Sequence, residues 1–179
     1  ARHYIDIDTY GDSARLILPK YWTQAVQKFG ESKLKENGIV PWHISSMYQR
    51  LRDAFAIKDG VMVLKLSAEL GHYIADAHVP LHTTENYNGQ LTNQHGIHGF
   101  WESRLPELFS KDYNFWVGKA KYIDDPQQAA WDAVWSAHVL VDEVLHKEKS
   151  LSDSLSIPKY SFEQRGQQIV KVYSREFAD

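Results

Sequence analysis

The stretch that decides the fold runs from Leu70 to Glu102 and reads LGHYIADAHVPLHTTENYNGQLTNQHGIHGFWE. It contains five of the nine histidines of the chain. His72 and Asp76 are four residues apart, so on a helix their side chains lie one above the other on a single face. His98 and Glu102 repeat this spacing after a polar loop. The pattern predicts two helices, each presenting one imidazole and one carboxylate.

The residue types in this stretch are those of a metal site. Neutral imidazoles and carboxylates bind zinc at roughly 2.0–2.2 Å, and a rigid helix face holds two such donors at a fixed separation. Pro80 disfavours a helical conformation at Val79, so we expect the chain to leave its helix there and bring His82 back toward the first pair. We therefore predict five metal ligands: His72, Asp76, His82, His98 and Glu102.

Three other histidines have plainer interpretations. His78 lies about 120° away from the face of His72 by the helical step of roughly 100° per residue, so we assign it to packing or solvent. His138 lies on an apolar stripe between tryptophans, where a hydrogen-bonded core histidine is the favoured interpretation. His43 lies in the first turn of an expected helix, where packing or capping is sufficient.

The composition is typical of a globular protein. Of 179 residues, 43% are hydrophobic and 13% aromatic, and we expect one domain over residues 1–179. The formal net charge of −3 provides no basic field, so we predict no stable nucleic-acid partner. No run approaches the roughly 20 apolar residues of a transmembrane segment. The absence of cysteine excludes disulfides and thiolate zinc sites.

Helical periodicity and helix-start signals predict an all-α, multi-helix bundle. Residues 1–18 are expected to be extended or rich in turns, and the last helix begins with a capping box formed by Ser161 and Gln164. An apolar stripe from Trp131 to Leu145 carries one helix through His146. The expected helices are Pro19–Gly30, Glu31–Asn37, Pro41–Asp59, Val61 through Asp76, His98–Phe109, Pro126 through His146, and Ser161–Asp179.

The ligand pattern resembles a known family. The run His72-x3-Asp76-x5-His82-x15-His98-x3-Glu102, with Pro80-Leu81 just before His82, is similar to the zinc-ligand core of the bacterial zinc-dependent phospholipase C and single-strand-specific zinc nuclease superfamily. That superfamily is an all-α bundle with a trinuclear zinc cluster that hydrolyses phosphodiesters. The resemblance implies the same fold and reaction class for this chain.

The opening segment adds a sixth ligand by the same resemblance. His3-Tyr4-Ile5-Asp6-Ile7-Asp8 resembles the family's His-aromatic-x-Asp segment, whose histidine is a zinc ligand. The residues alone leave His3 equally well explained as a loop side chain. The resemblance implies that a first zinc is held by His3, His72 and Asp76, that Asp76 also bridges to a third zinc, and that a second zinc is held by His82, His98 and Glu102.

The chain also departs from the family. There, the third zinc is otherwise held by a mature N-terminal Trp, through its amine and carbonyl, and by a nearby His, and an upstream Asp completes the first site. This sequence starts at Ala1, two residues before His3, and has none of these. We expect an N-terminal region to have been removed; the alternative is a chain born with a partial site. Either way, the third Zn²⁺ site is expected to be absent. Family members are exported, which implies a periplasmic or secreted location.

The resemblance implies hydrolysis by a metal-activated water that attacks phosphorus, with Asp76 and Asp6 as catalytic residues. Asp6 is either near the substrate or a turn carboxylate. Tyr4 either stacks on a base or lines a lipid-headgroup pocket, or it merely packs. The final ligand Glu102 favours the phospholipase branch of the family. The Asp-x-His-x-Pro-Leu-His motif from Asp76 to His82 favours the nuclease branch. The substrate therefore stays open between a phospholipid headgroup and single-stranded nucleic acid.

A hypothesis from another class is a zinc-stabilised helical binding module without catalytic turnover. Structural zinc sites are closed by four protein ligands, whereas catalytic sites keep a position for water. The three protein ligands of the expected second site favour catalysis. The sequence makes no prediction of oligomeric state.

Overall fold

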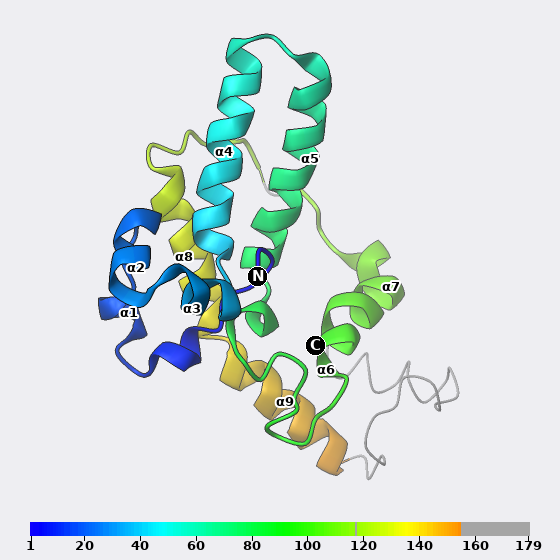
Figure 1. The fold of residues 1–179 in the computed structure, drawn as a ribbon. Helices are drawn as coiled ribbons and strands as arrows, with labels where there is room; N and C mark the ends of the chain where they lie inside the picture. The colour runs from blue at the N-terminus through cyan, green and yellow to red at the C-terminus, as the bar shows by residue number, and fades with distance from the viewer. Residues whose placement is uncertain (117, 155–179) are drawn as a thin grey trace. The chain divides into compact units, whose positions relative to one another are not determined.

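The computed structural model describes residues 1–116 and 118–154 of the chain. The described residues form helices and turns and contain no β-strand, which confirms the prediction of an all-α protein. The two longest helices, α4 (Val40–Ala56) and α5 (Gly60–Ala77), run antiparallel as a hairpin (Figure 1). The helix expected from Ser161 to Asp179, with its capping box, lies outside the described residues.

Internal contacts divide the chain into two compact units. Unit 1 comprises residues 1–85 and 122–140, and unit 2 comprises residues 86–121 and the segment that begins at Val141. Each unit has a buried apolar cluster of its own among the described residues. The single domain expected from the sequence stays a prediction, and each unit is described by itself.

Unit 1 is built around tryptophans. The ring of Trp42 on α4 meets those of Trp22 and Trp131 edge to face, with centroids 5.7 and 5.1 Å away. The indole N–H of Trp42 donates to the carbonyl of Pro19 at 3.2 Å, and that of Trp131 to the carbonyl of Lys20 at 3.1 Å. These bonds satisfy polar atoms that burial would otherwise penalise. Its remaining elements are the 3₁₀ turn η1 (Ile7–Tyr10), α1 (Ala14–Ile17), α2 (Trp22–Phe29), α3 (Glu31–Glu36), the 3₁₀ turn η2 (Pro80–Thr83) and α8 (Pro126–His138).

Local sequence explains how α5 begins and ends. The carboxylate of Asp59 accepts a hydrogen bond from the backbone N–H of Met62 at 3.0 Å, which caps the first turn. The helix ends at Ala77, and Val79 is extended (φ −85°, ψ 116°) because the ring of Pro80 excludes the helical conformation. The predicted departure of the chain at this point is therefore confirmed.

Four expected boundaries differ from the structure. α4 ends at Ala56 and not at Asp59, because Asp59 caps the start of α5. α2 begins at Trp22 and not at Pro19, because Tyr21 is extended and the carbonyl of Pro19 bonds to an indole. Residues 1–18, expected to lack helix, contain η1 and α1. The helix expected through His146 is interrupted after α8, and a new helix, α9 (Val141–Ser154), begins in unit 2.

Unit 2 contains one helical segment of mixed type. Its middle section, η3 (Phe100–Arg104), is a π-helical turn that lies between α6 (Ile97–Gly99) and α7 (Leu105–Phe109). Phe100 and Leu105 are buried and pack with Val144 of α9. The 3₁₀ turn η4 (Ser110–Asp112) follows α7. No helix within the described residues is long and apolar enough to cross a membrane.

A buried polar network, which sequence reasoning missed, fixes the loop before α6. Glu148 of α9 is only 1% exposed. Its carboxylate accepts hydrogen bonds from the side-chain amide of Gln94 and from the hydroxyl of Ser152, the latter at 2.6 Å. The same amide also donates to the carbonyl of Leu145 at 2.7 Å. Because these donors compensate the burial of the carboxylate, the network holds the loop on α9 within unit 2.

Candidate metal centre

Three predicted ligands from distant parts of the chain converge in unit 1. The Nδ1 atom of His3 lies 2.8 Å from Oδ2 of Asp76 and 3.1 Å from Nε2 of His72. The Nε2 atom of His72 lies 3.4 Å from the same carboxylate oxygen. The side chain of Asp76 is 6% exposed, whereas those of His3 and His72 are 51% and 59% exposed. The carboxylate is thus the buried base of a group whose imidazoles reach solvent.

The separations among these atoms fit a metal ion. Donors bound at about 2.0–2.1 Å in a tetrahedral arrangement lie about 3.3 Å from one another. The three observed separations of 2.8, 3.1 and 3.4 Å bracket this value. Two imidazole nitrogens and one carboxylate oxygen are also the donor types that zinc binds. The residues present therefore fit a zinc ion, with three protein donors.

His3 is positioned by backbone hydrogen bonds and not by a helix. The N–H of Ile5 donates to the carbonyl of His82 at 2.9 Å, and the N–H of Asp6 donates to the carbonyl of Asn37 at 2.7 Å. The N–H of Val40 donates to the carbonyl of Tyr4 at 3.2 Å. The segment that carries His3 is therefore fixed on one side to η2 and on the other to the connection between α3 and α4.

His82 approaches the other oxygen of the same carboxylate. Its Nδ1 atom lies 3.7 Å from Oδ1 of Asp76, and its side chain is 11% exposed. η2 directs it there, because the N–H of His82 donates to the carbonyl of Val79 at 3.0 Å and tightens the turn after the helix. Asp76 thus presents one oxygen to His3 and His72 and the other to His82. This is the arrangement of a carboxylate that is able to bridge two cations.

The second predicted helical pair lies in unit 2. The Nε2 atom of His98 lies 2.7 Å from Oε2 of Glu102, and the two side chains are 26% and 36% exposed. The Nδ1 atom of His98 faces the carbonyl of Tyr87 at 3.3 Å. The ring of His98 thus lies between a carboxylate oxygen and a backbone carbonyl oxygen. A carbonyl behind the ring is also how proteins orient metal-binding histidines.

The predicted second ligand set draws on both units. His82 belongs to unit 1, whereas His98 and Glu102 belong to unit 2. This set therefore stays a prediction from the sequence, and the structure supports its two parts separately.

Tyr4 and Asp6 lie on the fixed segment beside His3. The hydroxyl of Tyr4 donates to the carbonyl of Glu36 at 3.0 Å. A Cβ atom at Gly38 (φ +89°) would clash with the carbonyl oxygen of Tyr4 and lie 2.7 Å from its ring, so only glycine fits against this residue. Burial, followed by the negative charges of Asp8 and Glu85, raises the pKa of Asp6 from 3.8 to about 7. The carboxyl of Asp6 is therefore able to gain or lose a proton near neutral pH.

The acidic neighbour of Asp6 has a structural role that the sequence did not reveal. Asp8 accepts hydrogen bonds from the hydroxyl of Thr84 at 2.5 Å and from the backbone N–H of Glu85 at 3.0 Å. These bonds fix the chain just after η2. Asp8 therefore helps to position the turn that carries His82, although no spacing motif links the two residues.

The other histidines behave largely as expected. The N–H at Nδ1 of His138 donates at 3.1 Å to the hydroxyl oxygen of Thr83, which itself donates to Pro80, so His138 is a hydrogen-bonded packing residue. His78 is exposed at the end of α5, where Nδ1 bonds to the carbonyl of Ile74 at 2.8 Å. His43 packs edge to face on Tyr73, and burial lowers its pKa.

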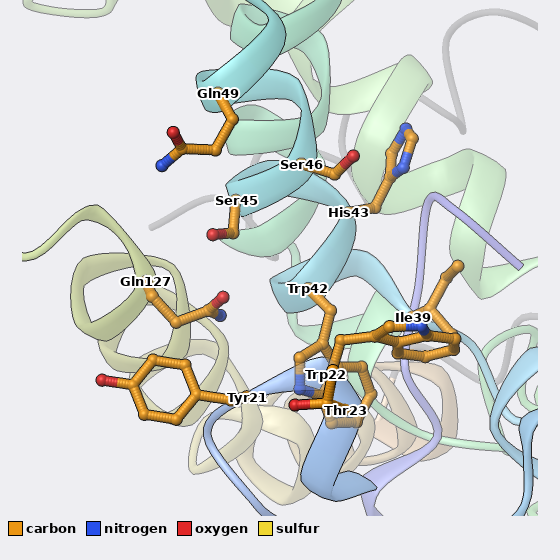
Figure 2. Close-up of a pocket in the computed structure, with 10 residues that line it drawn as sticks. All are labelled: Tyr21, Trp22, Thr23, Ile39, Trp42, His43, Ser45, Ser46, Gln49 and Gln127. Atoms are coloured by element: carbon orange, nitrogen blue, oxygen red, sulfur yellow. The ribbon is translucent and has the colours of Figure 1, made fainter. Parts of the chain in front are cut away.

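A cavity of about 430 Å³ lies at the N-terminal end of α4 (Figure 2). Its lining combines aromatic rings with hydroxyl and amide side chains, and it contains no carboxylate, lysine or arginine. The one imidazole is that of His43, whose Nε2 atom is buried and has no hydrogen-bond partner. Because no carboxylate joins that imidazole, the cavity provides no set of metal ligands. The lining residues are Tyr21, Trp22, Thr23, Ile39, Trp42, His43, Ser45, Ser46, Gln49 and Gln127.

Comparison with known proteins supplies no relative, since no family model, no curated protein and no solved structure matches the chain.

Proposed function

We propose that the protein is a zinc-dependent phosphodiester hydrolase, the reaction class implied by the resemblance of its ligand pattern. One observation carries the proposal. His3 and His72, which are 69 residues apart in the chain, meet at one buried carboxylate with separations that suit zinc. A surface histidine–acid pair needs no such convergence, and a core pair would not leave both imidazoles more than half exposed.

The residues of the unit 1 group would have distinct roles in such a site. His3, His72 and Asp76 would hold the ion, and the buried carboxylate would offset part of its charge. When bound, a zinc ion would supply a Lewis acid for phosphoryl oxygens and would lower the pKa of a bound water. The exposure of both imidazoles leaves the ion approachable from solvent. Three protein donors leave a coordination position open, which favours catalysis over a purely structural zinc site.

Asp6 is the candidate for proton transfer. A carboxyl whose pKa is raised to about 7 exchanges a proton with little free-energy cost at physiological pH. The proposal is supported by the backbone hydrogen bond between Ile5 and His82, which links the segment of Asp6 to one of the proposed metal ligands. The side chain of Tyr4 is held by the hydrogen bond of its hydroxyl and by the close approach of Gly38. Its contribution would therefore be to form a fixed part of the site surface.

A direct experiment tests the proposal. The protein is loaded with zinc, its metal content is measured by mass spectrometry, and hydrolysis of bis-p-nitrophenyl phosphate, single-stranded DNA and phosphatidylcholine is followed. We expect bound zinc together with hydrolysis of the first compound, and the other two arms separate nucleic-acid from lipid substrates. Zinc binding without hydrolysis of any of the three would contradict the proposal and favour the binding module.

A further inference from the structure

The outer end of the α4–α5 hairpin exposes large apolar side chains. Phe55 is 61% exposed, Ile57 75%, Val61 79% and Leu64 76%. All four fall within ten consecutive residues, around the turn that joins the two helices. Within unit 1, this turn lies at the end of the hairpin farthest from α2 and α3 (Figure 1). Single exposed apolar residues need no explanation, but a cluster of large ones marks an interaction site.

The fold of the hairpin does not use these side chains. Met47, Ala54 and Leu66 form the buried cluster between α4 and α5. Leu66 is 1% exposed, whereas Leu64, which points to the opposite side of α5, is 76% exposed. A helix that is apolar on both faces is normally covered on both faces. The outer apolar residues therefore serve a contact outside the hairpin.

The charge around this end differs from that of the whole chain. Residues 50–65 contain four cations and two carboxylates, a net charge of +2, whereas the chain carries −3. Asp59 is engaged as the cap of α5, and Asp53 lies 3.2 Å from the guanidinium of Arg52. The cations are Arg50, Arg52, Lys58 and Lys65, all of them exposed, and Lys65 lies 3.9 Å from the carboxylate of Glu69 on the same helix.

We propose that the outer end of this hairpin docks onto an anionic lipid bilayer. The four apolar side chains would enter the boundary between headgroups and acyl chains, and the flanking cations would remain among the lipid phosphates. The docking is peripheral, in keeping with the finding that no described helix could cross a membrane. It requires no metal and is independent of the proposed hydrolysis.

The positive charge of the hairpin end favours an anionic bilayer over a second copy of the chain as its binding partner. Two copies packed through the same hairpin end would bring the cations of one against the cations of the other, which opposes association. An anionic bilayer presents the opposite charge over the whole width of the hairpin. Apolar residues and cations together are also the composition that binds the surface of such membranes.

Vesicle sedimentation tests the proposal. The full chain, kept free of metal with EDTA, is mixed with vesicles of phosphatidylcholine alone or of phosphatidylcholine and phosphatidylglycerol. We expect sedimentation with the anionic vesicles, weaker binding to the neutral ones, and loss of binding in high salt because exposed charges are screened. The double variant Val61→Asp/Leu64→Asp is expected to bind at least about tenfold more weakly.

A matched control separates docking from general surface hydrophobicity. Leu16 of α1 is 88% exposed and lies outside the hairpin, so Leu16→Asp is expected to bind as the unmodified protein does. Circular dichroism verifies that the variants are folded. The proposal is overturned if the chain does not sediment with anionic vesicles, or if the Leu16 variant loses as much binding as the double variant. A dimer in light scattering that the double variant dissociates would also overturn it, in favour of the second copy.

Discussion

The two helical histidine–acid pairs have the same spacing and different environments. His72 and Asp76 are separated by 3.4 Å, and the carboxylate is buried and shared with two further imidazoles. His98 and Glu102 are in direct contact at 2.7 Å, and both side chains are partly exposed on a segment that includes a π-helical turn. The carboxylate of the first pair is therefore shared among several imidazoles, whereas the two donors of the second pair contact each other directly.

The difference shows that spacing alone does not build a metal site. Donors in contact with each other, such as His98 with Glu102 at 2.7 Å or His3 with Asp76 at 2.8 Å, must exchange that contact for contacts with the metal. The two pairs therefore differ in burial and not in the presence of such a contact. The side chain of Asp76 is 6% exposed, whereas that of Glu102 is 36% exposed. A carboxylate that is already removed from water interacts more strongly with a cation than one that water screens. We therefore expect the pair in unit 1 to govern the tighter zinc binding.

Asp76→Asn is expected to have the largest effect. The substitution keeps the shape of the side chain and removes the charge that three imidazoles share, so we expect zinc affinity to fall by more than about 100-fold and hydrolysis to be lost. Competition with a zinc-binding dye measures the affinity. Asp53→Asn, at an exposed position of α4, is the control. Unchanged zinc affinity in the Asp76 variant would remove Asp76 from the site.

His72→Ala is expected to weaken zinc binding by about 10- to 100-fold, because one of the donors on the buried carboxylate is lost while the others remain. The matched control is His78→Ala, since His78 is an exposed histidine at the end of the same helix. Mass spectrometry of the dialysed protein measures the metal content, and bis-p-nitrophenyl phosphate measures turnover. Equal losses in the two variants would argue against a specific role for His72.

Glu102→Gln is expected to have a smaller effect, of about tenfold, and on a different zinc ion. If the pair of unit 2 serves a second and weaker ion, the variant weakens the binding of that ion and leaves the affinity for the tighter ion unchanged. Calorimetric titration separates the two classes of ion. Loss of the tighter ion in this variant would reverse the ranking of the two pairs.

On zinc binding, Asp6→Asn is expected to have the smallest effect of the four variants, and this variant tests the pH dependence of stability instead. The folded carboxyl has a pKa of about 7 and the unfolded one about 3.8. Between these values the folded state keeps a proton that the unfolded state has released. The free energy of unfolding therefore decreases as pH rises from about 4 to 7 and levels off above.

The Asp6 variant should show a flatter profile over that range. Urea unfolding of the metal-free protein at several pH values measures it. Asp12→Asn, at an exposed position nearby, should retain the slope of the unmodified protein. An identical slope in the Asp6 variant would show that another group is responsible.

Local signals made much of the fold predictable. Helices were expected from Pro41, Val61 and Pro126, and α4, α5 and α8 begin at Val40, Gly60 and Pro126. The interruption between α8 and α9 has no such signal, because the apolar stripe continues through it. Packing into two different units decides it. The π-helical turn at Phe100–Arg104 likewise has no local mark in the sequence.

The site was predictable to a lesser extent. The return of His82 follows from Pro80, because the effect of a proline on the preceding residue is local. The convergence of His3 on Asp76 joins residues 73 positions apart, and no local pattern encodes such a contact. It was expected only through the family resemblance. The raised pKa of Asp6 depends on burial beside Asp8 and Glu85, which chain order does not reveal.

The backbone bond from Ile5 to His82 has a consequence for how the protein resists damage. Residues 1–6 also form backbone hydrogen bonds with Asn37, Ile39 and Val40. A terminal stretch without regular secondary structure is ordinarily an easy substrate for proteases. A single cut there would remove His3 and at the same time release the backbone that supports His82. An ion that joins His3 to Asp76 would, by mass action, make the same stretch harder to cleave.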